Sequence, residues 1–213
     1  MRRAMVAAQL SSLIGKKMGM ALTGLVLYGF LIGHLAVNTL LFKRDGGQSY
    51  NAYSEYLTHH PLLVPTELVL LAAFLLHIYL AIGVSLDNRR ARPIGYHVRS
   101  RAVGGRTWAS STMLWSGLLI LIFVVIHLKT FKFGDPGSGS LYDLVSATFK
   151  RTGYLVWYTF SMAILGFHLW HAFQSAFQTL SISSSKISML GIFFAIFLAL
   201  GFGLICLFMG LLA

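Results

Sequence analysis

Five long apolar segments, separated by short polar stretches, dominate the pattern of this 213-residue sequence. They cover residues 18–42, 64–86, 112–131, 153–180 and 187–211. A helix needs about 20 mostly apolar residues to cross the hydrocarbon core of a bilayer. The pattern therefore predicts an all-α fold, a bundle of five transmembrane helices in a single membrane domain over residues 1–213.

The polar stretches between these segments are rich in Gly, Ser, Pro and charged residues, which is typical of turns and loops. They read KRDGGQSYN, DNRRARPIG, KFGDPGSGS and SISSSK. One helical domain accounts for a chain of this length, so we expect these stretches to be connections between helices.

The composition agrees with a lipid environment. Hydrophobic residues make up 56% of the chain and charged residues 11%, whereas a soluble domain usually has about 25% charged residues. A formal net charge of +11 suits either nucleic acid or a membrane surface. The chain lacks the water-exposed surface on which nucleic-acid binders carry charge. The positive charge therefore points to helix orientation, anionic lipid or a partner subunit.

Lysine and arginine are distributed unevenly between the two sides of the predicted bundle. With a cytoplasmic N-terminus, the cytoplasmic side holds eleven of the 17 and the opposite side holds six. The connection 87–111 alone contains six arginines. Cytoplasmic loops are enriched in Lys and Arg, so we expect the N-terminus in the cytoplasm and, after five spans, the C-terminus outside.

Four histidines stand inside the first four apolar segments, one in each: His34, His77, His127 and His168. Ionisable residues in membrane helices are costly and are usually functional. From the rise of a helix, His34 and His127 lie about 12 and 6 Å below the outer ends of their segments, and His77 and His168 about 20 and 22 Å below. The histidines therefore sort into an outer pair, His34 with His127, and an inner pair, His77 with His168.

Such pairs can fill both axial positions of a haem iron, as a low-spin electron carrier requires. Small residues before the histidines would leave room for a flat macrocycle between helices; they are Gly24, Gly29, Gly33, Gly117 and Gly166. Cys206 is the single cysteine and no CxxCH motif is present, so coordination and packing alone would hold the haems. The residues favour two b-type haems. They leave open a proton relay through intramembrane histidines, as in a transporter or channel.

Four stretches around these histidines resemble a known family. They are KKMGMALTGLVLYGFLIGHL, LLHIYLAIG, WSGLLILIFVVIHL and GFHLWHAFQSAFQ. Over nearly its whole length, the chain resembles the single-chain dihaem cytochrome b membrane anchors of succinate dehydrogenases (succinate:quinone oxidoreductases) and fumarate reductases. The resemblance implies that the outer and inner pairs are haem ligands and that His171 is not.

The resemblance also implies a function and partners. The chain would be the electron-transfer and quinone-reactive subunit, in the inner (cytoplasmic) membrane, of a complex with a flavoprotein subunit and an iron–sulfur subunit. Its electron partner would be menaquinone or another quinone. The chain has no cysteine cluster, no dinucleotide-binding glycine motif and no dicarboxylate catalytic site of its own. A haem b anchor of another respiratory enzyme, such as a hydrogenase or formate dehydrogenase, is the alternative within haem proteins.

Further residues are candidates for contacts to these groups. Cationic side chains near the inner haem could bind its propionates; the candidates are Lys17, Arg99 and Arg106, with Lys16, Arg101 and Trp108 beside them. A quinone site needs a polar group near a membrane face, and Glu67 is the best placed. Its position is also explained by the dipole at a helix start. The other quinone-site candidates are Tyr50, Glu55, His59 and His60.

One position departs from the family pattern. Some fumarate reductases of this family carry a glutamate two residues before the inner ligand on the fourth helix, where it is proposed to transfer protons across the membrane. This chain has Gly166 there, so we expect no proton path through that carboxylate.

Overall fold

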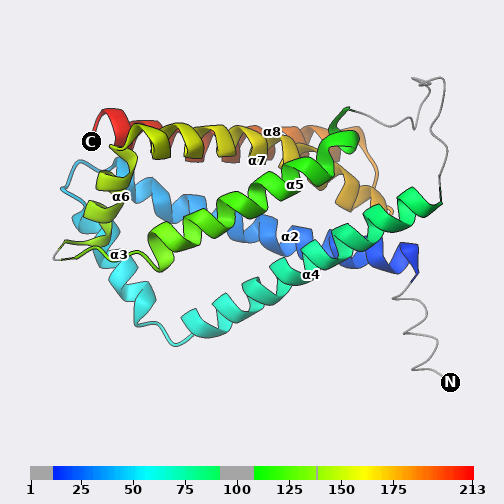
Figure 1. Ribbon diagram of the computed structural model, residues 1–213, viewed down its shortest axis with the longest axis horizontal. Coiled ribbons are helices and arrows are strands. Elements are labelled where there is room, and N and C mark those ends of the chain that lie inside the picture. Colours follow the sequence, from blue (N-terminus) through cyan, green and yellow to red (C-terminus); the bar gives the residue numbers. More distant parts are fainter. Residues whose placement is uncertain (1–11, 92–107, 138) are drawn as a thin grey trace.

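The computed structural model describes residues 12–91, 108–137 and 139–213, and these residues form helices without any strand (Figure 1). Five helices are long: α2 (Leu13–Asn38), α4 (Leu63–Arg90), α5 (Trp108–His127), α7 (Thr152–Thr179) and α8 (Ser185–Leu211). A 3₁₀ turn, η1 (Thr39–Phe42), extends α2, and a π-helical turn, η2 (Leu128–Lys132), extends α5. The predicted all-α fold is therefore confirmed for the described residues.

Four helical stretches in the described residues are long and apolar enough to cross a membrane. They are Leu13–Phe42, Leu63–Arg90, Thr112–Lys132 and Ser185–Leu211. The chain is therefore a multi-pass membrane protein that associates with a lipid bilayer. The fourth predicted segment forms α7, which has 28 residues but is less apolar, because its second half includes His168, His171, Gln174 and Gln178.

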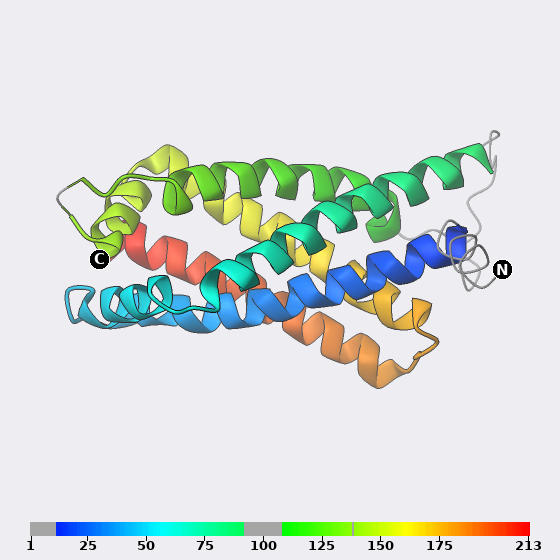
Figure 2. The same cartoon turned by 90° about the horizontal axis from the view of Figure 1, so that it is seen from below.

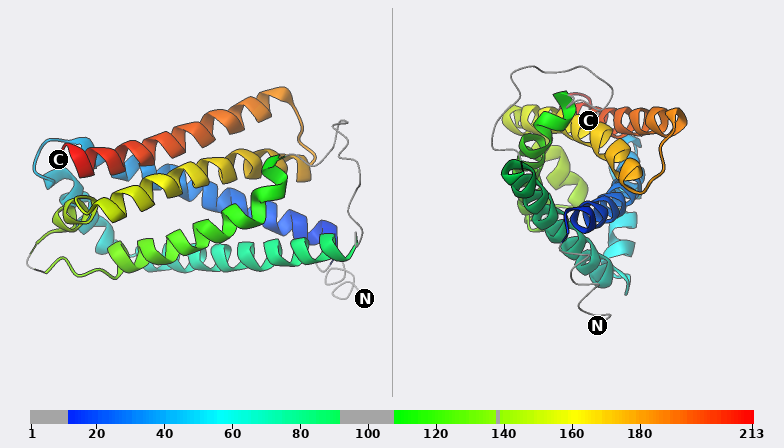
Figure 3. Two further views of the ribbon diagram at one scale, coloured as in Figure 1. Left: turned by 45° about the horizontal axis from the view of Figure 1, so that its top comes forward. Right: turned by 90° about the vertical axis from the view of Figure 1, so that its right-hand side faces the viewer.

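The long helices alternate in direction and lie around a common axis (Figures 1 and 3). α2 packs against α4 and α7, α5 packs against α7 and at a few positions against α4, and α8 covers α7 and the far side of α2. Among the described residues, α2 is not packed along α5, and α4 is not packed along α7. The helices α2, α4, α5 and α7 thus form a four-helix bundle. Its two diagonals, α2 with α5 and α4 with α7, are open, because the two helices of each diagonal are not packed together. Figure 2 shows α4 crossing α2.

Two short helices lie at the same end of the bundle as the C-terminus (Figure 1). They are α3 (Gln48–Thr58) and α6 (Leu141–Phe149), both in stretches predicted to be loops. α6 begins with a capping box in which Ser140 and Asp143 bond each other's backbone N–H, and these bonds lower the pKa of Asp143. The Tyr142 N–H donates to Asn51 Oδ1 at 3.0 Å, which ties α6 to α3.

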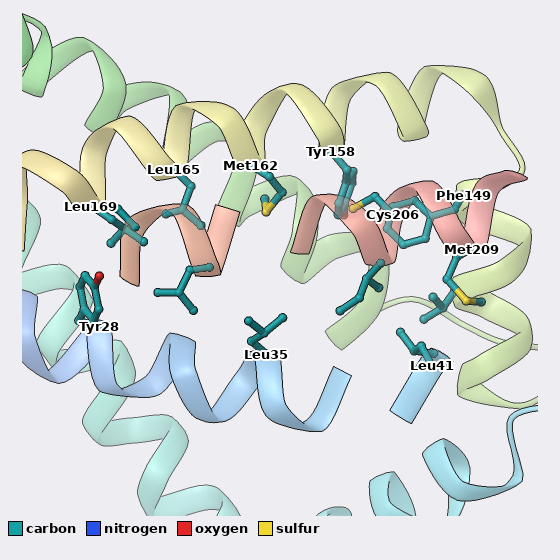
Figure 4. Packing of buried hydrophobic residues seen from close by; sticks show 14 of the residues in the cluster. Tyr28, Leu35, Leu41, Phe149, Tyr158, Met162, Leu165, Leu169, Cys206 and Met209 are labelled. Carbon is teal, nitrogen blue, oxygen red and sulfur yellow. The ribbon is translucent and has the colours of Figure 1, made fainter. Parts of the chain in front are cut away.

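The apolar core fills the space between α2, α7 and α8 (Figure 4). Leu41, Leu198 and Met209 are its most deeply buried large side chains. Glycine lets α7 and α8 approach closely: a Cβ atom at Gly166 would lie 2.8 Å from the Ala199 Cβ. Glycine at position 166 therefore has a packing reason, since this position faces α8 and leaves no space for a larger side chain.

We expect Gly166→Ala to destabilise the α7–α8 contact. The added methyl group overlaps Ala199, and such overpacking costs about 1–3 kcal/mol. Thermal unfolding in detergent should show a lower Tm than for the matched variant Gly29→Ala, because a Cβ at Gly29 has no neighbour within 4 Å. The double change Gly166→Ala with Ala199→Gly should restore the Tm. Equal Tm values for Gly166→Ala and Gly29→Ala would contradict this packing account.

Candidate functional site

The outer pair joins one open diagonal of the bundle. His34 lies on α2 and His127 ends α5, and their ring centroids are 5.9 Å apart with planes at 88°. An imidazole nitrogen binds a first-row metal at about 2 Å, so two imidazoles on opposite sides of one metal would have centroids about 6 Å apart. The spacing of this pair therefore fits an axial ligand pair.

Aromatic side chains enclose the outer pair. Phe30 stacks on the His34 ring with ring centroids 5.3 Å apart, and the centroid of the Phe202 ring lies 5.7 Å from that of His34. The aromatic neighbours of His127 are Phe123, Phe131 and Tyr158. The Nδ1 atom of His127 is buried and has no hydrogen-bond partner. Buried polar atoms are rarely left unpaired, so this nitrogen is a candidate for a bond that a cofactor would supply.

The inner pair lies on the other open diagonal, with His77 on α4 and His168 on α7. The His77 ring contacts α2 and the His168 ring contacts α5. Nδ1 of His77 lies 3.2 Å from the Met20 carbonyl oxygen and 3.2 Å from Thr23 Oγ1. A carbonyl can only accept, so His77 carries its proton on Nδ1. Its Nε2 therefore has a free lone pair, as a metal ligand requires.

His168 is held in the same way from α5. Its Nδ1 lies 3.0 Å from Ser116 Oγ, and that hydroxyl donates to the Met113 carbonyl at 3.1 Å. With its own proton donated to Met113, the Ser116 hydroxyl can accept an Nδ1–H from His168. Metal-binding histidines almost always donate their second ring nitrogen to such an acceptor. The Met20 carbonyl sets this tautomer at His77, and the Ser116 hydroxyl is compatible with it at His168, so both inner histidines can coordinate through Nε2.

Glycines leave space beside the inner rings. A Cβ at Gly24 would lie 3.2 Å from His77 Cε1, and one at Gly117 would lie 3.6 Å from His168 Cε1. A larger side chain at Gly24 would push the His77 ring away from the bundle axis. Gly29 and Gly33 have nothing within 4 Å of a built Cβ. Gly24 and Gly117 thus make room for the imidazole rings themselves, and room for a flat group beside the glycines stays a prediction.

Each of the two candidate sites provides two histidine ligands from the protein. No group of three or more His, Cys, Asp or Glu side chains that could hold a metal ion occurs in the described part of the chain. A bare ion needs three or four protein ligands, whereas a haem iron takes four nitrogens from its macrocycle and two axial ligands from the protein. The residues present therefore fit a haem better than a bare metal ion.

The other candidate residues are spread over both ends of the bundle. Lys17 is half-buried at the start of α2, while Arg99, Arg101 and Arg106 lie outside the described residues. Neighbouring Lys16 binds Asp87 on α4 at 2.7 Å.

Glu67 lies in the second turn of α4 and forms an ion pair with Lys132 of η2. This ion pair joins α4 to η2, which directly follows His127, and so gives Glu67 a structural role. His59 and His60 lie in the loop between α3 and α4, as predicted, and with Glu55 of α3 they line an open pocket of about 470 Å³. Tyr50 is buried, which raises the pKa of its hydroxyl.

Two residues that touch the inner histidines were missed from the sequence, Thr23 and Ser116. Each stands 11 residues before an outer histidine, Thr23 before His34 and Ser116 before His127. Eleven residues make three helical turns, so this repeated spacing is the signal that could have identified them.

No family model, no curated protein and no solved structure matches this chain.

We expect the Lys16–Asp87 pair to set the register of α2 against α4, and so to place Met20 beside His77. The two side chains are partly buried, at 25% and 30% exposure. Asp87→Asn should lower stability by up to about 1 kcal/mol, the usual range for such pairs. Thermal unfolding of the single variants Asp87→Asn and Lys16→Asp and of the swap Lys16→Asp with Asp87→Lys measures the coupling. A swap less stable than Lys16→Asp alone would contradict a specific ion pair.

Proposed function

We propose that this chain is a cytochrome b membrane anchor that holds two b-type haems and carries electrons between an iron–sulfur subunit and menaquinone or another quinone, in a succinate dehydrogenase or fumarate reductase. His34 and His127 would hold the outer haem, and His77 and His168 the inner haem. When bound, each haem supplies a one-electron iron couple. The observation that carries the proposal is that the two members of each histidine pair stand on helices that are not packed together, one pair on each diagonal, with the outer rings 5.9 Å apart.

The surroundings of the histidines support a haem over a proton relay. A relay needs a chain of hydrogen-bonded groups through the membrane. The outer rings are instead surrounded by phenylalanine, and His127 Nδ1 has no partner. All six acidic residues of the chain lie in connections, short helices or the end turns of α4. The aromatic side chains around the outer pair therefore provide no hydrogen-bonding group that would continue a relay from the inner pair.

The proposal includes five spans, with α7 crossing the membrane beside α8. Burial of the less apolar face of α7 against α2, α5 and α8 would remove its polar residues from lipid. The N-terminus would then be cytoplasmic and the C-terminus outside. The Lys- and Arg-rich end would face the flavoprotein and iron–sulfur subunits. Co-purification of those subunits, rather than hydrogenase or formate dehydrogenase subunits, supports this assignment over another haem b anchor.

Haem content tests the proposal. The purified protein should show a reduced-minus-oxidised α band and two haems per chain. Replacing His34 or His127 by Ala should remove one haem, and replacing His77 or His168 should remove the other, because each iron loses one axial ligand. His171→Gln is the matched control, and it should keep both haems. A purified wild-type protein without an α band would contradict the proposal.

Glu67 tests the quinone part of the proposal. Glu67→Gln keeps the side-chain size but removes the acid that would exchange a proton with quinol, and general acid–base groups contribute about 10²–10⁴-fold. We expect at least about a 10-fold slower haem reduction by a menaquinol analogue, with haem content unchanged. Lys132→Met breaks the same ion pair but keeps the carboxylate, so it should retain most of the rate. Equal losses in both variants would assign Glu67 to the ion pair and not to quinol chemistry.

A further inference from the structure

The helices α2 and α5 each carry two site residues on one face. In α2, Thr23 precedes His34 by 11 residues, and in α5, Ser116 precedes His127 by 11 residues. Eleven residues make three turns, so the two members of each set share a face and lie about 16 Å apart along the helix. Each helix therefore carries an imidazole at the outer level of the bundle and a hydroxyl at the inner level.

We propose that Thr23 and Ser116 are positioning residues for the inner haem: their hydroxyls fix the tautomer and the ring orientation of His77 and His168. This inference rests on the proposed function and goes beyond it, since it assigns a role to two residues that do not touch the iron. It also links the two haem sites, because the helices that carry the outer ligands hold the inner ligands in place.

The directions of the hydrogen bonds carry the assignment. Thr23 Oγ1 donates to the Gly19 carbonyl at 2.8 Å, and Ser116 Oγ donates to the Met113 carbonyl at 3.1 Å. Each hydroxyl has one proton, and that proton is used within its own helix. Toward the histidines, both hydroxyls therefore act as acceptors of an Nδ1–H. This leaves the lone pair of each imidazole on Nε2.

The outer pair lacks this arrangement. Among the described residues, neither the His34 ring nor the His127 ring forms a hydrogen bond, and both rings contact aromatic side chains instead. An imidazole that donates its second N–H is more basic and gives more electron density to the iron. Hydrogen bonding around the ligands is one of the means by which a protein tunes haem potential. Loss of the hydroxyls should therefore raise the midpoint potential of the inner haem only.

The two hydroxyls should differ in the size of their effect. His77 has a second acceptor, the Met20 carbonyl oxygen at 3.2 Å, so it keeps one hydrogen bond when Thr23 is lost. Ser116 is the acceptor recorded for His168 Nδ1. We therefore expect Ser116→Ala to shift the potential more than Thr23→Val.

Potentiometric titration and EPR of the purified complex test the inference on four variants and one control. Ser116→Ala and Thr23→Val remove the hydroxyls, while Ser116→Thr and Thr23→Ser keep them. Ser161→Ala is the matched control, since the Ser161 hydroxyl donates to the Trp157 carbonyl within α7. The haem lost in His77→Ala identifies the inner signal. Haem content of each variant is measured first, as a readout independent of activity.

The expected result is a positive shift of the inner midpoint potential and a changed inner EPR gmax in Ser116→Ala, a smaller shift in Thr23→Val, and wild-type values in the hydroxyl-retaining variants and in Ser161→Ala. Loss of the inner haem alone from Ser116→Ala, with retention in Ser116→Thr, also supports the role. Unchanged inner signals in Ser116→Ala, or equal shifts of both haems, would overturn the inference while leaving the proposed function intact. A wild-type protein without haem would overturn both.

Discussion

The ring nitrogen atoms of four histidines need bonding partners inside an apolar helix bundle, and the arrangement of the bundle follows from that requirement. A buried polar group without a partner costs about 1–3 kcal/mol. At the inner level, α2 and α5 meet the requirement with a carbonyl and two hydroxyls. At the outer level, the protein leaves His127 Nδ1 unpaired among aromatic rings. An axial bond to iron would offset this cost, which is why the unpaired nitrogen supports the haem proposal.

The packing of the helices places the histidines in two separate pairs. α2 with α4, and α5 with α7, are in direct contact, while the diagonals that carry the histidine pairs are not packed. Glycine residues allow the close contacts in this packing. Gly24 makes room for the His77 ring, and Gly166 lets α7 pack closely against α8. The α8 helix thus serves as a fixed support behind α7, and the large buried side chains of the core lie on that side (Figure 4). The opposite side of the bundle, around α4, is lightly packed and exposes its apolar residues to lipid.

Much of this arrangement could be predicted from the sequence, because membrane helices have a strong hydrophobic pattern and histidine is conspicuous within it. The predicted segments correspond to helices, and the rings of His34 and His127 lie 5.9 Å apart in the structure. The short helices α3 and α6 fall in stretches predicted as connections. The capping box of Ser140 and Asp143 is a sequence signal that could have identified α6, whereas the Asn51–Tyr142 bond joins residues far apart in the sequence and carries no such signal. Thr23 and Ser116 were missed because one hydroxyl in an apolar segment carries no signal until its neighbour is known. Five spans, the haems and the partner subunits stay predictions.

The central claim is that two irons are each held by two histidines of this chain. Near-infrared magnetic circular dichroism of the oxidised, purified protein tests it most directly, because the charge-transfer band of low-spin haem reports the chemical type of both axial ligands. The account predicts bis-histidine bands that integrate to two haems per chain, with half of the intensity lost on replacing either member of a pair. Histidine–methionine bands, high-spin haem or the absence of haem would contradict it.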